Sequence, residues 1–355
     1  MSHFKNGKIP EGYTEYVGKK TAFIAFLFAA SAALFLIAVS RGPVPIPIAD
    51  TIRTLAGYDT GPRARNIILN IRLPQAFTAV LAGAGLAAAG AAMQSVLRNP
   101  LGSPFTLGMS NAAAFGAAFA VMILGTGAMA SAGGLALGSY YITALAAFIC
   151  CLLGAFAIIG VSRLRGASPE VMVLTGIAIG SLFTAGTMFL QYFADDVQLA
   201  AMVFWTFGDL SRASWREIGF LGVLVPAGCG YFMLNRWNYN AIDSGDETAQ
   251  GLGVKVDRVR VAGMMAASLL TAAVVAVLGV IGFVGLVCPH IVRRVIGDDH
   301  RFLMPGSCLA GASLLLASDT AARLAMPPHA LPVAVLTAFM GAPVFIFLII
   351  RGYRR

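Results

Sequence analysis

The sequence predicts an all-α, polytopic membrane protein with about ten transmembrane helices in two inverted five-helix halves. Of its 355 residues, 58% are hydrophobic and only 12% are charged, whereas soluble proteins carry about 25% charged residues. Long stretches without Asp, Glu, Lys or Arg recur along the chain, and a spanning helix needs about 20 apolar residues. Residues 73–85 and 331–343 both start with Leu-Pro and continue with small residues. This weak internal echo, with an odd number of spans per half, predicts the inversion.

The uncharged stretches give the number of spans. The stretch 99–162 is long enough for two spans with a break at Gly125–Gly138, and 261–292 holds one span and part of another. All the stretches together are 21–40, 73–97, 99–162, 171–194, 218–235, 261–292, 302–318 and 324–350.

The positive charge of the chain fits an orientation in the membrane. The net charge is +9. With ten crossings and both termini in the cytoplasm, most of the 25 basic residues fall on the cytoplasmic side, as the positive-inside rule requires. We therefore expect orientation in the membrane, rather than a nucleic-acid partner, to account for these charges, and membrane lipid is expected around the chain.

Residues 1–20 are polar and are expected to form a cytoplasmic tail, followed by one membrane domain over 21–355. The tail has no hydrophobic centre, so no cleavable signal peptide is expected. Gly12–Thr21 reads GYTEYVGKKT. A phosphate loop needs four residues between the glycines and Ser or Thr directly after the Lys, and this segment has five residues and a second Lys. Nucleotide binding is therefore not expected in this chain.

The segment 41–71 follows the first span on the outer side. Its prolines alternate in GPVPIPIAD, which disfavours helix and favours extended chain. The second span is rich in Gly and Ala, which let helix backbones approach closely in lipid. Gln94 is its polar exception, and it either lines a path through the membrane or hydrogen-bonds to a neighbouring helix. Gly176 and Gly180 give the fifth span a second small-residue face.

Three later segments have their own signatures. Aromatic residues lie beside charged ones in 192–217, which indicates the outer membrane interface, with a short helix expected over Val197–Phe207. Residues 279–290 are too rich in Gly and Pro for an uninterrupted helix, and irregular backbone at membrane depth is tolerated inside protein or beside water. Asp319 and Arg323 are four residues apart and can pair on one helix face.

The segment from Asn235 to Arg260, here called the polar segment, separates two long apolar runs. We expect a short helix in it, capped by Asp243 or Ser244 and closed by Leu252 and Gly253, because acidic residues suit the first turn of a helix. A solvated loop is the simpler alternative.

Catalysis and metal binding are not expected in this chain. The five cysteines lie in or beside apolar runs without metal-ligand spacing. His290 has no second histidine or acid nearby in the sequence to complete a catalytic set, and it is expected to cap a helix end. No cofactor or metal is expected.

Several blocks resemble the FecCD permeases, the membrane subunits of bacterial importers for iron–siderophores, haem and cobalamin. They are RLPQAFTAVLAGAGLAAAGAAMQSVLRNPLGSPFTLGMSNAAAFG (72–116), GVIGFVGLVCPHIVRRVIGDDHRFLMPGSCLAGASLLLASDTAARLA (279–325) and LPVAVLTAFMGAPVFIFLIIR (331–351). The resemblance implies ten helices per subunit and a second permease subunit, either a copy or a relative. It also implies two separate ATP-binding cassette subunits, an extracytoplasmic substrate-binding protein, and a bacterial or archaeal cytoplasmic (inner) membrane.

The resemblance also implies site residues. In the family, the loop between spans six and seven contacts the ATPase, and here that loop is the polar segment, with contact residues Asp246, Glu247, Ala249, Leu252 and Gly253. Outward arginines dock the binding protein, here Arg72 and Arg323. Gln75 replaces a second docking arginine, which shifts the role to Arg63 or Arg65. The translocation path is expected to include Gln94, Gly176 and Gly180. The inner gate falls near Ser168, but Pro169 and Glu170 depart from the small hydroxyl residues usual there.

The expected function is ATP-driven import of an iron(III)–siderophore complex, with cobalamin or haem as the alternative cargo. An ion-coupled secondary transporter is the alternative of another class. Such transporters carry membrane-embedded charges, and the stretches 99–162, 171–194 and 261–289 have none.

Overall fold

The computed structural model describes residues 11–126, 136–164, 168–327 and 329–352. Helix is the regular structure throughout these residues, apart from an isolated bridge between Met326 and His329. The predicted all-α class is therefore confirmed. Within the described residues, seven helices are long and apolar enough to cross a membrane, and two shorter apolar helices accompany them. The count of ten and the inverted halves remain predictions.

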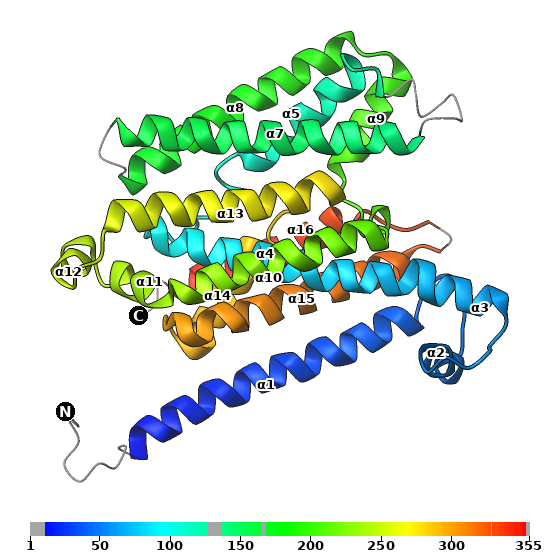
Figure 1. Ribbon diagram of the computed structural model, residues 1–355, viewed down its shortest axis with the longest axis horizontal. Helices are drawn as coiled ribbons and strands as arrows, with labels where there is room; N and C mark the ends of the chain where they lie inside the picture. Colours follow the sequence, from blue (N-terminus) through cyan, green and yellow to red (C-terminus); the bar gives the residue numbers. More distant parts are fainter. Residues whose placement is uncertain (1–10, 127–135, 165–167, 328, 353–355) are drawn as a thin grey trace.

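The long helices lie roughly parallel to one another (Figure 1). From residue 11 to residue 193 the helices are α1 (Glu11–Ser40), α2 (Ile48–Leu55), α3 (Pro62–Ile67) with a π-helical turn (Ile68–Arg72), α4 (Leu73–Val96), α5 (Met109–Met122), α7 (Ala136–Arg163) and α8 (Pro169–Phe193). From residue 196 to residue 352 there follow α9 (Asp196–Thr206), a 3₁₀ turn (Leu210–Arg212), α10 (Trp215–Leu234), α11 (Arg236–Asp243), α12 (Asp246–Gly251), α13 (Val256–Leu278), α14 (Val284–Ile296), α15 (His300–Ala325) and α16 (Val333–Gly352).

Helix α4 is the centre of the bundle, because its small residues let other backbones come close. All of its residues from Leu86 to Val96 are buried, and it packs against α10, α13, α14 and α15. A Cβ added at Gly83 would overlap the backbone of Gly311, and one at Gly90 would overlap the backbone of Gly285. The predicted close packing of the small-residue face is thereby confirmed.

The predicted interruption near 279–290 is also confirmed. Helix α13 ends at Leu278 and α14 begins at Val284. Gly279 has φ +81°, and Phe283 has φ +67°, a conformation that is rare for an aromatic residue. Ile281 and Gly282 are buried, so this irregular backbone lies inside protein, where its polar groups are tolerated at membrane depth.

The extended chain predicted for 41–71 is correct only for its first part. Residues 41–47 are not helical, but α2 and α3 follow. Pro47 precedes the first residue of α2, and Pro62 is the first residue of α3. Proline fits the first turn of a helix because no intrahelical partner is lost there. These prolines therefore start helices rather than prevent them.

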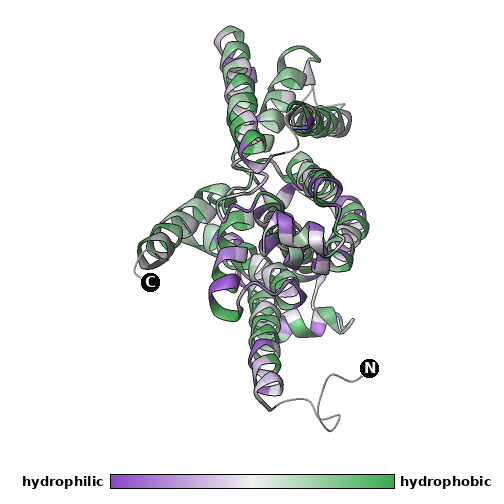
Figure 2. Cartoon of the chain, turned by 90° about the vertical axis from the view of Figure 1, so that its left-hand side faces the viewer, coloured by the Kyte–Doolittle hydropathy of each residue, from purple (hydrophilic) through white to green (hydrophobic). Residues whose placement is uncertain are grey.

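The two ends of the bundle carry different elements. The polar segment and the N-terminal end of α1 lie at one end, and α2 and α3 lie at the other (Figure 1). In the view along the helices, hydrophilic colour gathers around α11 and α12, and α16 projects away from the rest of the bundle (Figure 2). Helix α1 begins ten residues before the apolar run at Thr21, so Gly12–Thr21 is helical and is no phosphate loop. Residues 1–10 of the predicted tail lie outside the described residues.

Candidate functional site

The polar segment folds as two short helices, α11 and α12, rather than one. Asp243 is the last residue of α11, and Ser244 follows it. Gly245, with φ +116°, occupies the position before α12. The predicted capping by Asp243 or Ser244 is therefore wrong, because a glycine provides the sharp turn that brings the second helix back toward the bundle.

An ion pair ties α12 to the bundle. The Arg260 Nη2 atom lies 3.0 and 2.9 Å from the two carboxylate oxygens of Asp246. Arg260 Nε donates to the carbonyl of Val96 at the end of α4, at 2.8 Å. The Arg260 side chain is only 2% exposed, and burying a charge this deeply requires such partners. Arg98 adds a longer contact of 3.9 Å to Asp246.

A second polar cluster ties α11 to α4 and α15. The buried His300 Nε2 atom lies 3.0 Å from Asp243 Oδ2 and 2.8 Å from Ser95 Oγ. Arg293 Nη1 lies 3.7 Å from the same carboxylate oxygen. Asn240 accepts from the His300 backbone N–H at 2.8 Å. The histidine therefore joins three helices at one point.

Asp299 continues this cluster at the start of α15. Its carboxylate accepts from Arg301 Nη2 at 2.6 Å and from Asn240 Nδ2 at 3.2 Å. Burial disfavours the charged form, but the hydrogen bonds from Arg301 and Asn240 outweigh it and hold the pKa of the Asp299 carboxyl below its usual range. Asp299 is therefore an anion that anchors α11 at neutral pH.

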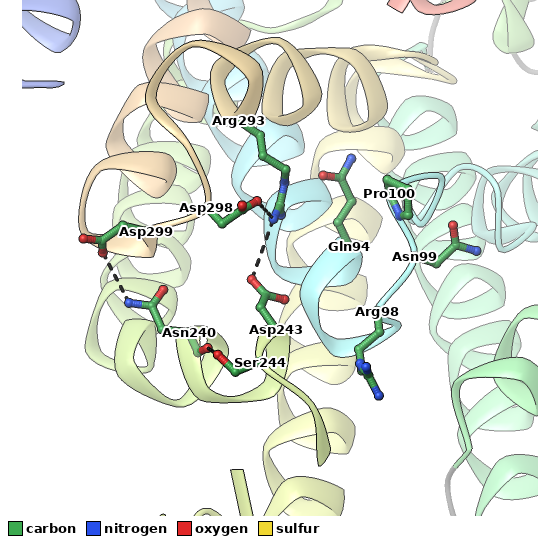
Figure 3. A pocket seen from close by; sticks show the side chains of 10 residues that line it. All are labelled: Gln94, Arg98, Asn99, Pro100, Asn240, Asp243, Ser244, Arg293, Asp298 and Asp299. Carbon is green, nitrogen blue, oxygen red and sulfur yellow. Dashed lines mark hydrogen bonds and ion pairs between the residues drawn. The ribbon is translucent and has the colours of Figure 1, made fainter. Parts of the chain in front are cut away.

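A cavity of about 580 Å³ opens between these ties (Figure 3). Gln94 lies on its wall and donates through Nε2 to the carbonyl of Leu286 on α14, at 3.1 Å. The cross-helix hydrogen bond is thus confirmed, and a role in the path stays a prediction. The full lining is Gln94, Arg98, Asn99, Pro100, Asn240, Asp243, Ser244, Arg293, Asp298 and Asp299.

A second cavity, of about 630 Å³, brings the gate candidates beside the polar segment. Ser168 is the N-cap of α8, with its hydroxyl 3.4 Å from the Val171 N–H. It lines this cavity together with Pro169 and Glu170, opposite Asp246 and Arg260. The start of α8 and the start of α12 therefore line one cavity.

The predicted ATPase contacts divide into two groups. Glu247 and Leu252 are exposed, Leu252 by 71%, and Gly253 is exposed with φ +84°. Ala249 is fully buried in a small apolar cluster of α11, α12 and α13, and Asp246 faces Arg260. Glu247, Leu252 and Gly253 are therefore the residues that are exposed to a partner, whereas Ala249 and Asp246 hold α12 against the bundle.

The predicted docking arginines also divide. Arg63 and Arg65 are exposed on α3, at the end opposite the polar segment. Arg72 is 2% exposed and donates to the carbonyls of Ser40, at 2.7 Å, and Val44. The expectation that Arg72 is exposed is therefore wrong, because the chain after α1 folds over it; its role in docking stays a prediction.

Arg323 is likewise buried. It pairs with Asp319 at 2.9 Å, as its spacing predicts, and donates to the carbonyl of Ala38 at 3.1 Å. Arg323 is therefore buried rather than exposed on the outer surface, and its role in docking stays a prediction. Arg72 and Arg323 together hold the segment between α1 and α2.

Gly176 and Gly180 form a packing face on α8. A Cβ at Gly176 would lie 2.9 Å from the Leu107 side chain, and one at Gly180 would lie 3.0 Å from Gly108 Cα. Both glycines also line a groove of about 390 Å³ between α5 and α8. They permit close contact of these helices, and their place in a translocation path remains a prediction.

Sequence reasoning missed Arg260 and His300 as organising residues. The signal was available in part, since each is a polar residue at the start of an apolar run. His290 lies inside α14, so its predicted helix-end position is wrong. Among the described residues there is no group of three or more His, Cys, Asp or Glu side chains that could hold a metal.

Comparison with known proteins agrees with this architecture. The FecCD transport family model matches residues 29–351. An ABC transporter permease protein of Methanocaldococcus jannaschii is 49% identical over 98% of this chain and 99% of its own. The hemin transport system permease protein HmuU of Yersinia pestis is 39% identical over 85% and 88%. The Fe(3+)-citrate import system permease protein YfmE of Bacillus subtilis is 35% identical over 89% and 91%.

A solved structure, an inward-facing conformation of a metal-chelate type ABC transporter, superimposes with a TM-score of 0.80 at 27% identity. It covers 93% of this chain and 99% of its own. The family match spans nearly all of the membrane helices, and the relatives are membrane permeases of ABC transporters. The chain is therefore a membrane permease that belongs to the FecCD transport family.

Proposed function

We propose that this chain is the permease subunit of an ATP-driven importer that translocates an iron(III)–siderophore complex. A substrate-binding protein delivers the complex from outside, and ATP is hydrolysed by two separate subunits. The family match over residues 29–351 carries this proposal. The iron chelate is supported by the relative named for Fe(3+)-citrate and by the metal-chelate type structural neighbour.

Haem is the second candidate cargo, favoured by the relative named for hemin transport. Cobalamin remains an alternative from the sequence resemblance. All three cargoes are bulky metal complexes. A path lined by small side chains would let any of them pass without strong binding.

The contacts of the polar segment support a mechanical role. The exposed residues Glu247 and Leu252 offer a surface to an ATPase subunit. A push on α12 would be transmitted through Asp246–Arg260 to α13 and the end of α4, and a push on α11 through Asp243–His300 to α15. Because hydrogen-bonded ion pairs that are partly shielded from water are strong, we expect α11 and α12 to move together with the helices to which these pairs connect them.

The test of the function is uptake by its host cells with the gene deleted and restored. Cells are supplied with ⁵⁵Fe-labelled siderophores, labelled haem and labelled cobalamin in parallel. We expect restored uptake of an iron–siderophore only, abolished by ATP depletion and resistant to dissipation of ion gradients. If uptake of haem or cobalamin were restored instead, that compound would replace the iron–siderophore as the proposed cargo. Uptake that follows an ion gradient without ATP would overturn the ATP-driven mechanism.

A first prediction concerns the ATPase surface. Leu252→Asp is expected to reduce uptake at least tenfold and to lower recovery of an ATPase subunit in affinity purification. The thermal midpoint of the chain should change little, since Leu252 is exposed and its replacement opens no cavity. Leu164→Asp is the matched control, because Leu164 is 85% exposed beside the same end of the bundle. Equal loss in both variants, or retained coupling in Leu252→Asp, would contradict the prediction.

A second prediction concerns docking of the substrate-binding protein. Arg63→Glu is expected to slow association about tenfold at low salt, because rim charges act mainly on the association rate. The effect should shrink as ionic strength rises. Arg53→Glu makes the same charge change on the neighbouring α2 and serves as control. Surface plasmon resonance with the permease complex in lipid discs measures both rates. If both variants slowed association equally, the effect would come from the overall charge of the outer surface and not from a contact of Arg63.

A further inference from the structure

We propose that the protein has a binding site for the headgroup of an anionic phospholipid where α1, α11 and α15 meet. The site is a cluster of three cations and two rings, here called the cation–ring cluster. Its members are Lys20, Arg236, Trp237, Arg301 and Phe302.

The cluster is connected through its rings. The guanidinium carbons of Arg236 and Arg301 lie 5.7 and 5.2 Å from the centre of the Trp237 ring. Arg301 is also 5.5 Å from the Phe302 ring, and Lys20 Nζ is 5.3 Å from it. These distances allow cation–π contact. Two guanidinium groups thus contact one tryptophan ring, and the ring itself brings no negative charge to them.

The balance of charge favours an anionic ligand. Asp299 is the carboxylate that pairs with a member of the cluster, through Arg301. Among the described contacts, Arg236 donates to the carbonyl of Met233 at 2.8 Å, and Lys20 donates to the hydroxyl of Tyr16. Neither contact brings a negative charge. The guanidinium groups of Arg236 and Arg301 contact the same ring, and each has the planar, bidentate geometry that binds phosphate oxygens.

The position of the cluster selects a lipid phosphate over a free one. Arg236 follows the last residues of α10, Arg301 is the second residue of α15, and Lys20 lies where the apolar part of α1 begins. These are the ends of spanning helices, the level at which headgroups lie and Trp is enriched. Helix α15 packs against both α1 and α10. Exposed apolar residues on the flanking helices, Leu234, Phe26 and Phe28, can contact the acyl chains.

A lipid bound here would reach the polar segment. Arg236 is the first residue of α11, and Asp299, the partner of Arg301, also accepts from Asn240 on α11. The lipid would therefore stabilise the packing of α11 on α15. Its occupancy would change the same contacts that an ATPase subunit would have to move.

The experiment uses the full chain in discs of phosphatidylcholine with or without phosphatidylglycerol. Native mass spectrometry counts retained phosphatidylglycerol, and a thermal scan measures its shift of the midpoint. Wild type should retain phosphatidylglycerol and gain several degrees, whereas Arg236→Gln should lose most of both. Arg236→Lys should keep part of the binding. Arg163→Gln is the matched control, since Arg163 is an exposed arginine at the end of α7 for which the described contacts include no ring.

Each outcome is decisive. An unchanged midpoint of Arg236→Gln in pure phosphatidylcholine shows that the variant is folded, and retention of the lipid by such a folded variant would overturn the site. Equal loss in Arg163→Gln would reduce the effect to general surface charge and also overturn it. An equal midpoint shift with inorganic phosphate would make the cluster a small-anion site, contrary to the proposal.

Discussion

Gly90→Ala is expected to prevent stable folding of the membrane domain. A single methyl group at this position would overlap the backbone carbonyl of Gly285, and the two helices α4 and α14 would have to separate. Overpacking in a well-packed interior costs about 1–3 kcal/mol, and we expect the upper end because the obstacle is backbone rather than a flexible side chain. Accumulation in the membrane and the thermal midpoint in detergent measure the effect.

Gly222→Ala is the matched control for this prediction. Gly222 also lies in a spanning helix, but a Cβ there meets nothing within 4 Å. Alanine favours helix over glycine by about 0.5–1 kcal/mol, so this variant should equal or exceed the wild type in stability. A normal midpoint for Gly90→Ala would show that α4 and α14 do not pack as closely as the structure places them.

The sequence predicted those features of the fold that depend on local composition. Apolar stretches located the spans, the Gly and Pro content of 279–290 located the break before α14, and the spacing of Asp319 and Arg323 predicted their pair. Each signal lies within one short stretch of chain. A helix of small residues also predicted close packing, although the partner helices α14 and α15 had to be read from the structure.

Features that depend on distant partners were not predictable in this way. Arg72 resembles a surface arginine in sequence, but the carbonyls of Ser40 and Val44 surround it because residues 41–47 fold over it. Ala249 was grouped with contact residues, although it fills an apolar cluster with Ile242 and Val256. In each case the residues that bury the side chain are distant in the sequence or reached only through a turn. Residue type alone therefore does not predict whether the side chain is buried or exposed.

Arg260→Met is expected to release α12 from the bundle and to abolish uptake. The substitution keeps much of the side-chain volume but leaves the Asp246 carboxylate and the Val96 carbonyl without their donor. Removing one member of a buried ion pair costs about 3–5 kcal/mol; Asp246 is 32% exposed, so water offsets part of this and we expect about 2 kcal/mol. Hydrogen exchange of the amides from Thr248 to Leu252 should accelerate about thirtyfold, the factor equivalent to that free energy.

Arg258→Met separates this effect from a general loss of charge. Arg258 lies two residues earlier on α13 and is exposed, so its replacement should leave both exchange and uptake close to wild type. If Arg260→Met lost uptake while exchange in α12 stayed slow, Arg260 would act on the cargo path rather than on the polar segment. If both variants accelerated exchange equally, the charge of this end of the bundle, and not the Asp246–Arg260 pair, would hold α12. Faster exchange confined to Arg260→Met would assign the anchoring of α12 to that pair, since Arg98, the other described arginine near Asp246, lies 3.9 Å away and is 47% exposed.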